Sequence, residues 1–347
     1  MKNKIYNIQA LRGIAVLFVV LYHIIAIETK YNPSYIVMFD FFKIGNIGVD
    51  IFFIISGFIM VTVTKNYFKD RNKFYKFMYL RFTRIYPLYW FYTILLLPIL
   101  FVKPEWINSS QDGNVNILSS ILLFPTETLP LIMVGWSLIH EIYFYIIFGL
   151  FLLLIDRSKL IKYVFIWLLI IIISNIFSDY SSPLIKLIIN PLTVEFMAGV
   201  LLGIYYLNNS HNIRFSKVLL FISFLSLLFI SYLHESIEIQ GWNRIIIFGM
   251  PSFLIILFSI EVEKQGFIFN KYLILIGDAS YSIYLSHLLT LNVVAKVFNI
   301  FLYENYIFEL FMIIAMITIA LAWGLISYKY IETPIINFTK KIHKEKI

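Results

Sequence analysis

The sequence predicts an all-α polytopic membrane protein with about ten transmembrane helices and both termini in the cytoplasm. Composition is the first reason: of 347 residues, 60% are hydrophobic and 14% are charged, and the mean hydropathy is +0.84. A soluble protein of this length would need a charged surface that this composition does not supply. The second reason is that the apolar residues are gathered in segments of about 20 residues, the length that crosses a bilayer as a helix. The third is the uneven distribution of lysine and arginine between the loops that join these segments.

The apolar segments are the expected transmembrane helices. The first follows Lys2 and Lys4, and no small-residue cleavage site comes after it, so we expect a retained signal anchor. A weaker apolar stretch, 115–126, is expected to form an interfacial or re-entrant helix. The ten expected spans are 11–28, 47–64, 84–102, 134–155, 160–178, 186–207, 215–233, 242–260, 273–298 and 305–328.

The basic residues give the expected orientation. Most of the 28 lysines and arginines fall at the N-terminus, in alternate loops or in the C-terminal tail, and the positive-inside rule places these segments in the cytoplasm. We expect residues 1–335 to form one transmembrane domain and residues 336–347 to form a basic tail on anionic lipid headgroups. The net charge of +8 is explained in the same way and needs no nucleic-acid partner. The chain has no cysteine, which excludes disulfides and thiolate chemistry.

Arg12 and His23 are the first polar residues that stand out, because both belong to the first apolar segment. Eleven residues of α-helix rise about 16.5 Å in about three turns, so the two side chains lie on one helix face. Arg12 is either a snorkelling anchor at the cytoplasmic surface or a functional cation. His23 lies deeper, where it either makes a hydrogen bond between helices or serves a function.

Three further ionisable residues, Glu141, Glu195 and His287, lie in the outer half of their expected helices, at a depth similar to that of His23. Titratable groups are costly inside a membrane, and four of them at one level indicate a shared polar cavity. Asp50 lies near the outer end of its helix, where it either faces the helix dipole or lines the mouth of that cavity.

Arg81 and Arg84 stand out from the basic segment 65–84. Their i,i+3 spacing places both guanidinium groups on one helix face at the expected cytoplasmic entrance to the membrane. Such a pair suits the bidentate binding of phosphate, and the same charges also suit a topology anchor. Asp278 is expected to cap the start of its helix. No metal site is expected, because neither paired histidine ligands nor an HExxH motif occurs.

Seven short motifs together give the sequence a resemblance to the acyltransferase-3 superfamily of integral-membrane acyltransferases. They are "LRGIAVLFVVLYH", "GVDIFFIISGF", "RFTRIYPLYW", "GWSLIHEIYFY", "EFMAGVLLG", "GDASYSIYLSH" and "YIETP". They occur in the family's order and cover nearly the whole chain. Their spacing resembles that of the stand-alone exopolysaccharide and O-antigen O-acetyltransferases. The resemblance implies ten spans in the bacterial cytoplasmic membrane, acetyl-CoA as donor and an O-acetylated surface glycan as product.

With this resemblance the polar residues take expected roles. Arg81 and Arg84 would bind the phosphates of acetyl-CoA, and Arg12 would guide the pantetheine arm inward. His23 is then either the general base for a sugar hydroxyl or a transient acyl carrier, and Glu141 orients or charge-balances an imidazole. The residues expected to bind the acceptor are Asp50, Trp136, Glu195 and His287.

Two alternatives stay open beside this interpretation. Many relatives carry a soluble esterase-like domain after the last span, whereas this sequence continues for too few residues to hold one. We therefore expect this chain to deliver acyl groups itself or to a separate partner. A transporter or flippase of a lipid-linked oligosaccharide also needs polar groups in mid-membrane. Paired arginines on the inner face alone favour the enzyme. No oligomeric state is predicted.

Overall fold

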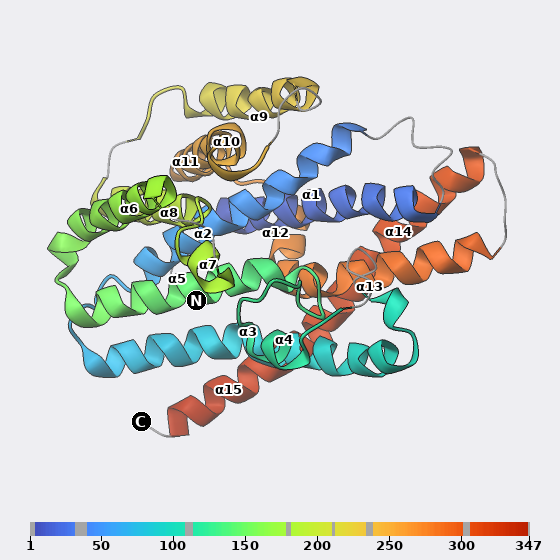
Figure 1. Ribbon diagram of the computed structural model, residues 1–347. Coiled ribbons are helices and arrows are strands. Elements are labelled where there is room, and N and C mark those ends of the chain that lie inside the picture. Colours follow the sequence, from blue (N-terminus) through green and yellow to red (C-terminus); the bar gives the residue numbers. More distant parts are fainter. Residues whose placement is uncertain are drawn as a thin grey trace. The chain divides into compact units, whose positions relative to one another are not determined.

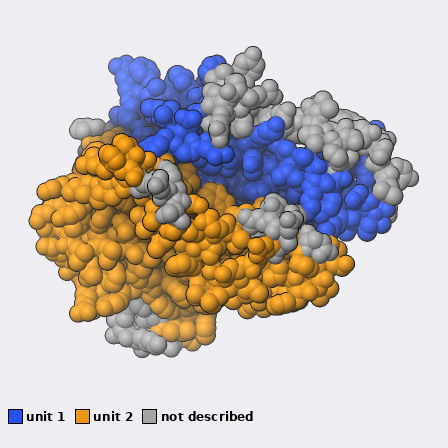
Figure 2. All heavy atoms as spheres, in the orientation of Figure 1, with its two compact units in different colours: residues 1–55, 210–332 blue, residues 56–209, 333–347 orange. Residues whose placement is uncertain are grey.

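A computed structural model describes residues 4–31, 40–107, 114–177, 182–209, 212–233, 239–300 and 306–345. Every regular element in these residues is a helix, which confirms the all-α class (Figure 1). The chain divides into two compact units (Figure 2). Unit 1 comprises residues 1–55 and 210–332, and unit 2 comprises residues 56–209 and 333–347.

Eight helical segments of the described residues are long and apolar enough to cross a membrane, which confirms a polytopic membrane protein. They are Tyr6–Tyr31, Phe42–Val63, Arg71–Val102, Gly135–Leu154, Arg157–Phe177, Pro183–Asn208, Gly241–Lys264 and Ile307–Ile342. Each overlaps one of the ten expected spans. The expected span 215–233 corresponds to helix α9 (Ser216–Leu233), and 273–298 is divided between α12 (Lys271–Asp278) and α13 (Ser280–Asn299). The orientation of the termini stays a prediction.

Unit 1 is built around helix α1 (Tyr6–Tyr31), which packs against α12. Gly13 of α1 and Gly277 of α12 face each other, and a Cβ atom at Gly277 would meet the carbonyl oxygen of Gln9. Small residues of this kind let two backbones approach closely in a membrane protein. The other elements of the unit are η2 (Asp40–Asn46), the first half of α2 (Ile47–Val63), α9, α10 (Gly241–Arg244), the π-helix Ile245–Gly249, α11 (Met250–Lys264), α13, α14 (Tyr306–Ser327) and the π-helix Tyr328–Glu332.

The junction between α12 and α13 corrects the expectation for Asp278. This residue ends α12 instead of starting a helix, and Ala279 is the N-cap of α13. The carboxylate of Asp278 accepts hydrogen bonds of 2.8 and 2.7 Å from Lys4 Nζ. The expectation was wrong because the single apolar run covers two helices, the first of which already begins at Lys271 with Asn270 as its cap.

Unit 2 contains the second half of α2 and the longest described helix, α3 (Arg71–Val102), which begins after the N-cap Asp70. Helix α3 packs against α5 (Gly135–Leu154) and α15 (Thr333–Glu345). Tyr79 Oη of α3 donates a 2.9 Å hydrogen bond to the carbonyl oxygen of Thr339 in the basic C-terminal segment. The remaining elements are η3 (Pro104–Trp106), α4 (Ile117–Leu122), η5 (Arg157–Lys159), α6 (Leu160–Phe177), α7 (Pro183–Ile188) and α8 (Thr193–Asn208).

The stretch 115–126 contains only the short helix α4, so it does not cross the membrane as a separate span. Three side chains of α3 hold the last turn of this helix. Tyr86, Tyr89 and Trp90 donate hydrogen bonds of 2.9, 2.7 and 2.9 Å to carbonyl oxygens of α4. These are the carbonyl groups that a helix end leaves without an intrahelical partner, so α4 is fixed along α3.

Candidate active site

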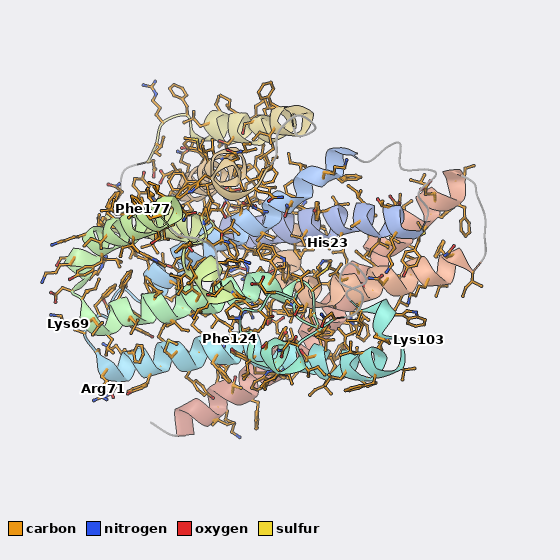
Figure 3. All side chains as sticks on the ribbon, viewed as in Figure 1. His23, Lys69, Arg71, Lys103, Phe124 and Phe177 are labelled. Carbon is orange, nitrogen blue, oxygen red and sulfur yellow. The ribbon has the colours of Figure 1, made fainter. Side chains whose placement is uncertain are left out.

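His23 and His287 form a contact pair within unit 1. His23 comes from α1, where Figure 3 labels it, and His287 comes from α13. The Nε2 atom of His287 lies 3.3 Å from Nδ1 of His23, and the ring centroids are 4.9 Å apart. His287 is fully buried, and Tyr22 and Tyr284 each contact one of the two imidazoles. The sequence analysis singled out both histidines, and the structure brings them together.

Backbone carbonyl groups fix the tautomers of this pair. Nδ1 of His23 lies 2.8 Å from the carbonyl oxygen of Val19, and Nδ1 of His287 lies 2.7 Å from that of Tyr284. A carbonyl oxygen only accepts, so each Nδ1 carries the hydrogen. Nε2 of neutral His287 then accepts from Nδ1–H of His23. The Nε2 atom of His23 keeps a free lone pair, because no described residue donates a hydrogen bond to it.

Asp50 lies in unit 1 near the start of α2, and both of its carboxylate oxygens are engaged by Arg244. Arg244 Nε donates to Oδ1 at 2.9 Å and Nη2 donates to Oδ2 at 2.7 Å. Nη2 also contacts the backbone and side-chain oxygens of Asn46, both at 3.2 Å. Asp50 is fully buried, so this is an internal bidentate ion pair. The sequence analysis did not single out Arg244 as a partner of Asp50.

Arg12 lies on α1, and its guanidinium donates a 3.2 Å hydrogen bond to Gln9 one turn earlier. It is half-buried and stays on the helix that carries His23. The 26-residue length of α1 without interruption supports the expected spacing of about three turns between Arg12 and His23.

A second polar cluster in unit 2 contains Glu141, Tyr145, Ser56 and Arg81. Tyr145 Oη donates a 2.5 Å hydrogen bond to Glu141 Oε1, and Ser56 Oγ donates to the same oxygen at 3.2 Å. The guanidinium of Arg81 lies over the ring of Tyr145. The guanidinium carbon lies 5.6 Å from the centre of the Tyr145 ring and 5.5 Å from that of Phe77.

Helix α3 begins well before the expected span, and the point at which it enters the membrane stays a prediction. Helix α3 begins at Arg71, and Arg81 is its eleventh residue, so it lies about 15 Å along the helix. It contacts Tyr145, the eleventh of the 20 residues of α5. The expected span began only at residue 84, because the preceding segment is rich in charge. The i,i+4 spacing of Glu141 and Tyr145 was the signal for their contact.

The other predicted site residues of unit 2 lie on three helices. Trp136 is in the first turn of α5, and its ring contacts the His140 ring edge-on at 5.8 Å. Glu195 is buried and is the third residue of α8. The first turn of a helix favours a carboxylate. Arg84 is half-buried, three residues after Arg81 on α3.

The predicted residues are thus distributed over two units. His23, His287, Arg12 and Asp50 belong to unit 1, and the expected pairing of His23 with Glu141 joins residues of different units and stays a prediction. Within unit 1, the side chain that hydrogen-bonds His23 is His287. In the described part of the chain, no group of three or more histidine, cysteine or acidic residues is arranged to hold a metal ion.

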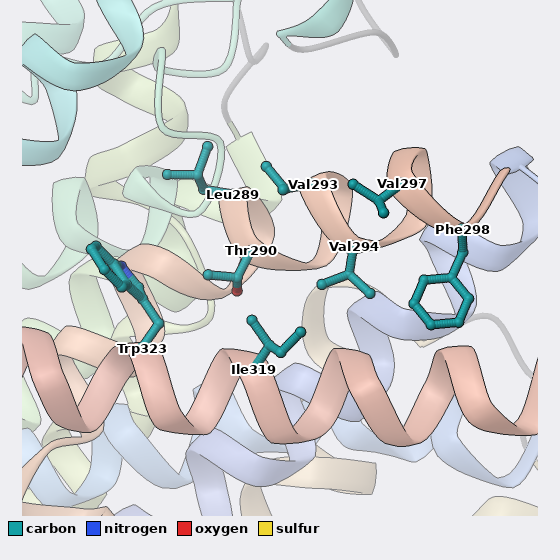
Figure 4. Close-up of a pocket in the computed structure, with 8 residues that line it drawn as sticks. All are labelled: Leu289, Thr290, Val293, Val294, Val297, Phe298, Ile319 and Trp323. Atoms are coloured by element: carbon teal, nitrogen blue, oxygen red, sulfur yellow. The ribbon is translucent and has the colours of Figure 1, made fainter. Parts of the chain in front are cut away.

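A pocket of about 300 Å³ lies between α13 and α14 (Figure 4). Val293, Ile319 and Trp323 are among the residues that line it. Thr290 also lines it, but its hydroxyl donates back to the carbonyl oxygen of His287 at 2.8 Å. The pocket therefore offers apolar contact rather than reacting groups.

Comparisons with known proteins agree with the resemblance. A family model described as an acyltransferase domain matches residues 5–328. The chain is similar to the exopolysaccharide production protein ExoZ of Rhizobium meliloti (strain 1021), with 26% identity over 275 residues. The aligned region covers 74% of this chain and 79% of that protein. No solved structure matches.

Proposed function

The chain belongs to the acyltransferase-domain family, acyltransferase-3, and from this premise we propose that it moves an acetyl group from cytoplasmic acetyl-CoA to a hydroxyl of a cell-surface or lipid-linked glycan. Membership in an acyltransferase family favours an enzyme over the transporter that the sequence left open. The similarity to ExoZ, which is named as an exopolysaccharide production protein, supports a glycan acceptor. The bacterial cytoplasmic membrane is the location that suits a cytoplasmic donor and a surface product.

The free Nε2 lone pair of His23 is the observation that carries this proposal. In the proposed step, Nε2 takes the proton of the acceptor hydroxyl while the hydroxyl oxygen attacks the thioester carbonyl carbon. The carbon–sulfur bond then breaks. The CoA thiolate takes the proton from the imidazolium of His23, which returns to its starting tautomer, so the step balances.

His287 is the positioning residue of this step. When His23 is protonated, its Nδ1–H still donates to Val19 and to Nε2 of His287. The lone pair of His287 and the carbonyl dipole thus stabilise the positive charge, as a carboxylate does in a catalytic triad. His287 keeps this orientation because its own Nδ1–H is held by Tyr284.

Other predicted residues are proposed to bind the two substrates. Arg12 and Arg84 are cationic and only half-buried, which suits contacts with the acyl donor. Trp136 offers an aromatic face of the kind that packs against a sugar ring, and Glu195 offers carboxylate oxygens that accept hydrogen bonds from sugar hydroxyls.

The test uses the purified full-length protein in lipid nanodiscs, with acetyl-labelled acetyl-CoA and a glycan acceptor. We expect CoA release and labelled glycan from the wild type, and loss of both by at least about a hundredfold in His23→Ala, because general-base catalysis contributes roughly 10²–10⁴ in rate. His211→Ala, which removes a histidine outside the apolar segments, is the matched control and keeps full activity.

Two results would contradict the proposal. Near-normal glycan acetylation by His23→Ala would remove this residue from the chemistry. Stable label on the wild-type protein in the absence of acceptor, lost in His23→Ala, would show an acyl carrier instead of a general base.

A further inference from the structure

The cluster of Arg81, Tyr145 and Glu141 is more specific than a cationic patch. We propose that it binds the uncharged pantetheine arm of the acyl donor, through one of the amide groups of that arm, and not the nucleotide phosphates. This inference rests on the proposed use of acyl-CoA. It changes the role that the sequence gave to Arg81 and gives Tyr145 a role that the sequence did not predict.

Charge balance is the first reason. The Tyr145 hydroxyl donates to Glu141 Oε1 at 2.5 Å, and the Arg81 guanidinium lies 5.6 Å from the centre of the Tyr145 ring, so the same tyrosine contacts a guanidinium and a carboxylate. The cluster has no net charge. A phosphate brought to Arg81 would also meet the nearby carboxylate of Glu141, and the repulsion would offset much of the attraction. Phosphate sites in proteins instead gather uncompensated donors and positive charge.

Unused hydrogen-bonding groups are the second reason. The Nε–H of Arg81 is buried and has no hydrogen-bond partner among the described residues. Both hydrogen bonds that described residues donate to Glu141 use Oε1, so Oε2 is left for another donor. The cluster therefore offers one N–H donor and one oxygen acceptor. A secondary amide supplies the complementary carbonyl oxygen and N–H.

The surroundings of Arg81 are the third reason. The rings of Phe77 and Tyr145 flank the guanidinium, and both residues are buried. Phe77 and Phe148 are in turn 5.9 Å apart between ring centroids, which extends the aromatic wall along α3 and α5. An unpartnered N–H in such a place costs free energy that a ligand carbonyl would recover. A slim uncharged chain fits this wall better than a hydrated phosphate.

The position along α3 agrees with this assignment. The exposed start of the helix carries Arg71, with further basic residues nearby, whereas Arg81 lies about three turns farther on. In acetyl-CoA the pantetheine arm separates the phosphates from the thioester. A group beyond the exposed basic end therefore meets the arm before it meets the acetyl group.

The experiment is displacement of labelled CoA from the wild-type protein in nanodiscs by two competitors. Pantetheine carries the amides but no phosphate, and adenosine 3′,5′-bisphosphate carries phosphates but no amide. In Tyr145→Phe, which keeps the ring and removes the hydroxyl that holds Glu141, we expect pantetheine to bind about tenfold to a hundredfold more weakly, because the carboxylate is no longer fixed to accept the amide N–H. The same loss is expected in Arg81→Lys, which keeps the charge and removes Nε–H. Binding of the bisphosphate should be unchanged in both.

Arg71→Gln is the matched control, because it removes an exposed guanidinium from the same helix; pantetheine binding should be unchanged. The proposal is overturned if the two cluster variants weaken the bisphosphate and spare pantetheine. It is also overturned if they lower the melting temperature and leave both competitors unaffected, which is the result of a purely structural link. If pantetheine does not displace CoA from the wild type, the arm is not recognised and the inference fails by itself. If CoA does not bind the wild type at all, the proposed function fails instead.

Discussion

Removing Arg244 tests the buried ion pair that it forms with Asp50. In Arg244→Ala the Asp50 carboxylate stays fully buried and loses two hydrogen bonds, of 2.7 and 2.9 Å. Removing one partner of a buried pair costs about 3–5 kcal/mol, because a charge is left uncompensated. We therefore expect the free energy of unfolding of Arg244→Ala to fall by about that amount.

A double-mutant cycle measures the coupling directly. The free energy of unfolding in mixed detergent micelles would be compared for Arg244→Met, Asp50→Asn and the double variant. We expect a coupling energy of about 2–3 kcal/mol, with the double variant more stable than Arg244→Met alone, because no bare charge remains. A coupling energy near zero would refute the ion pair. If Asp50→Asn instead lowers kcat/KM for the glycan and leaves stability unchanged, Asp50 binds the acceptor, as the sequence predicted.

Three further outcomes are expected. Gly277→Ala should prevent stable folding, measured as lost monodisperse protein, because its Cβ would meet backbone of α1; normal yield would contradict that packing. Cysteines at Lys73 and Lys344 should be labelled only from the cytoplasm, and one at Asn108, outside the described residues, only from outside; reversed labelling refutes the orientation. Hydrogen bonds from Lys69 and Lys159 lower the pKa of Asp156 below its ordinary 3.8. The contribution of these bonds to folding stability is therefore fully present above pH 3.8 and is lost as the pH falls through the lowered pKa. The stability difference between Asp156→Asn and wild type should vanish in acid, and a constant difference would contradict it.

Composition and segment length predicted the class of fold because both express one physical requirement. A helix in lipid must be apolar along about 20 residues, and every segment that meets this condition is visible in one sequence. The division of 273–298 into α12 and α13 was not visible in this way. A helix break that is buried in protein leaves the composition of the apolar run unchanged. The residue at this break, Asp278, pairs with Lys4, which is 274 residues away in the chain and therefore cannot be identified as its partner from local sequence.

The two histidines show what polarity predicts and what it does not. His23 and His287 stood out because a titratable group in an apolar helix is costly and rarely accidental. Their direct contact depends on the packing of α1 against α13, and helical periodicity contains no information on partners. Within unit 1 the groups that orient His23 are His287 and the Val19 carbonyl, and the predicted role of Glu141 at the imidazole stays a prediction.

Arg81 shows that the start of a helix is not the point at which hydropathy rises. Each expected helix was started where hydropathy rises, so a charge before that point was assigned to the membrane surface. Helix α3 in fact continues back to Arg71 through the charged segment. The surroundings of Arg81 on this helix suit a cation, because the rings of Phe77 and Tyr145 lie beside it and Tyr145 hydrogen-bonds the carboxylate of Glu141. The hydropathy profile registers the charge of Arg81 but not the aromatic rings and the carboxylate that surround it. These neighbours are the reason for proposing an amide rather than a phosphate as its ligand.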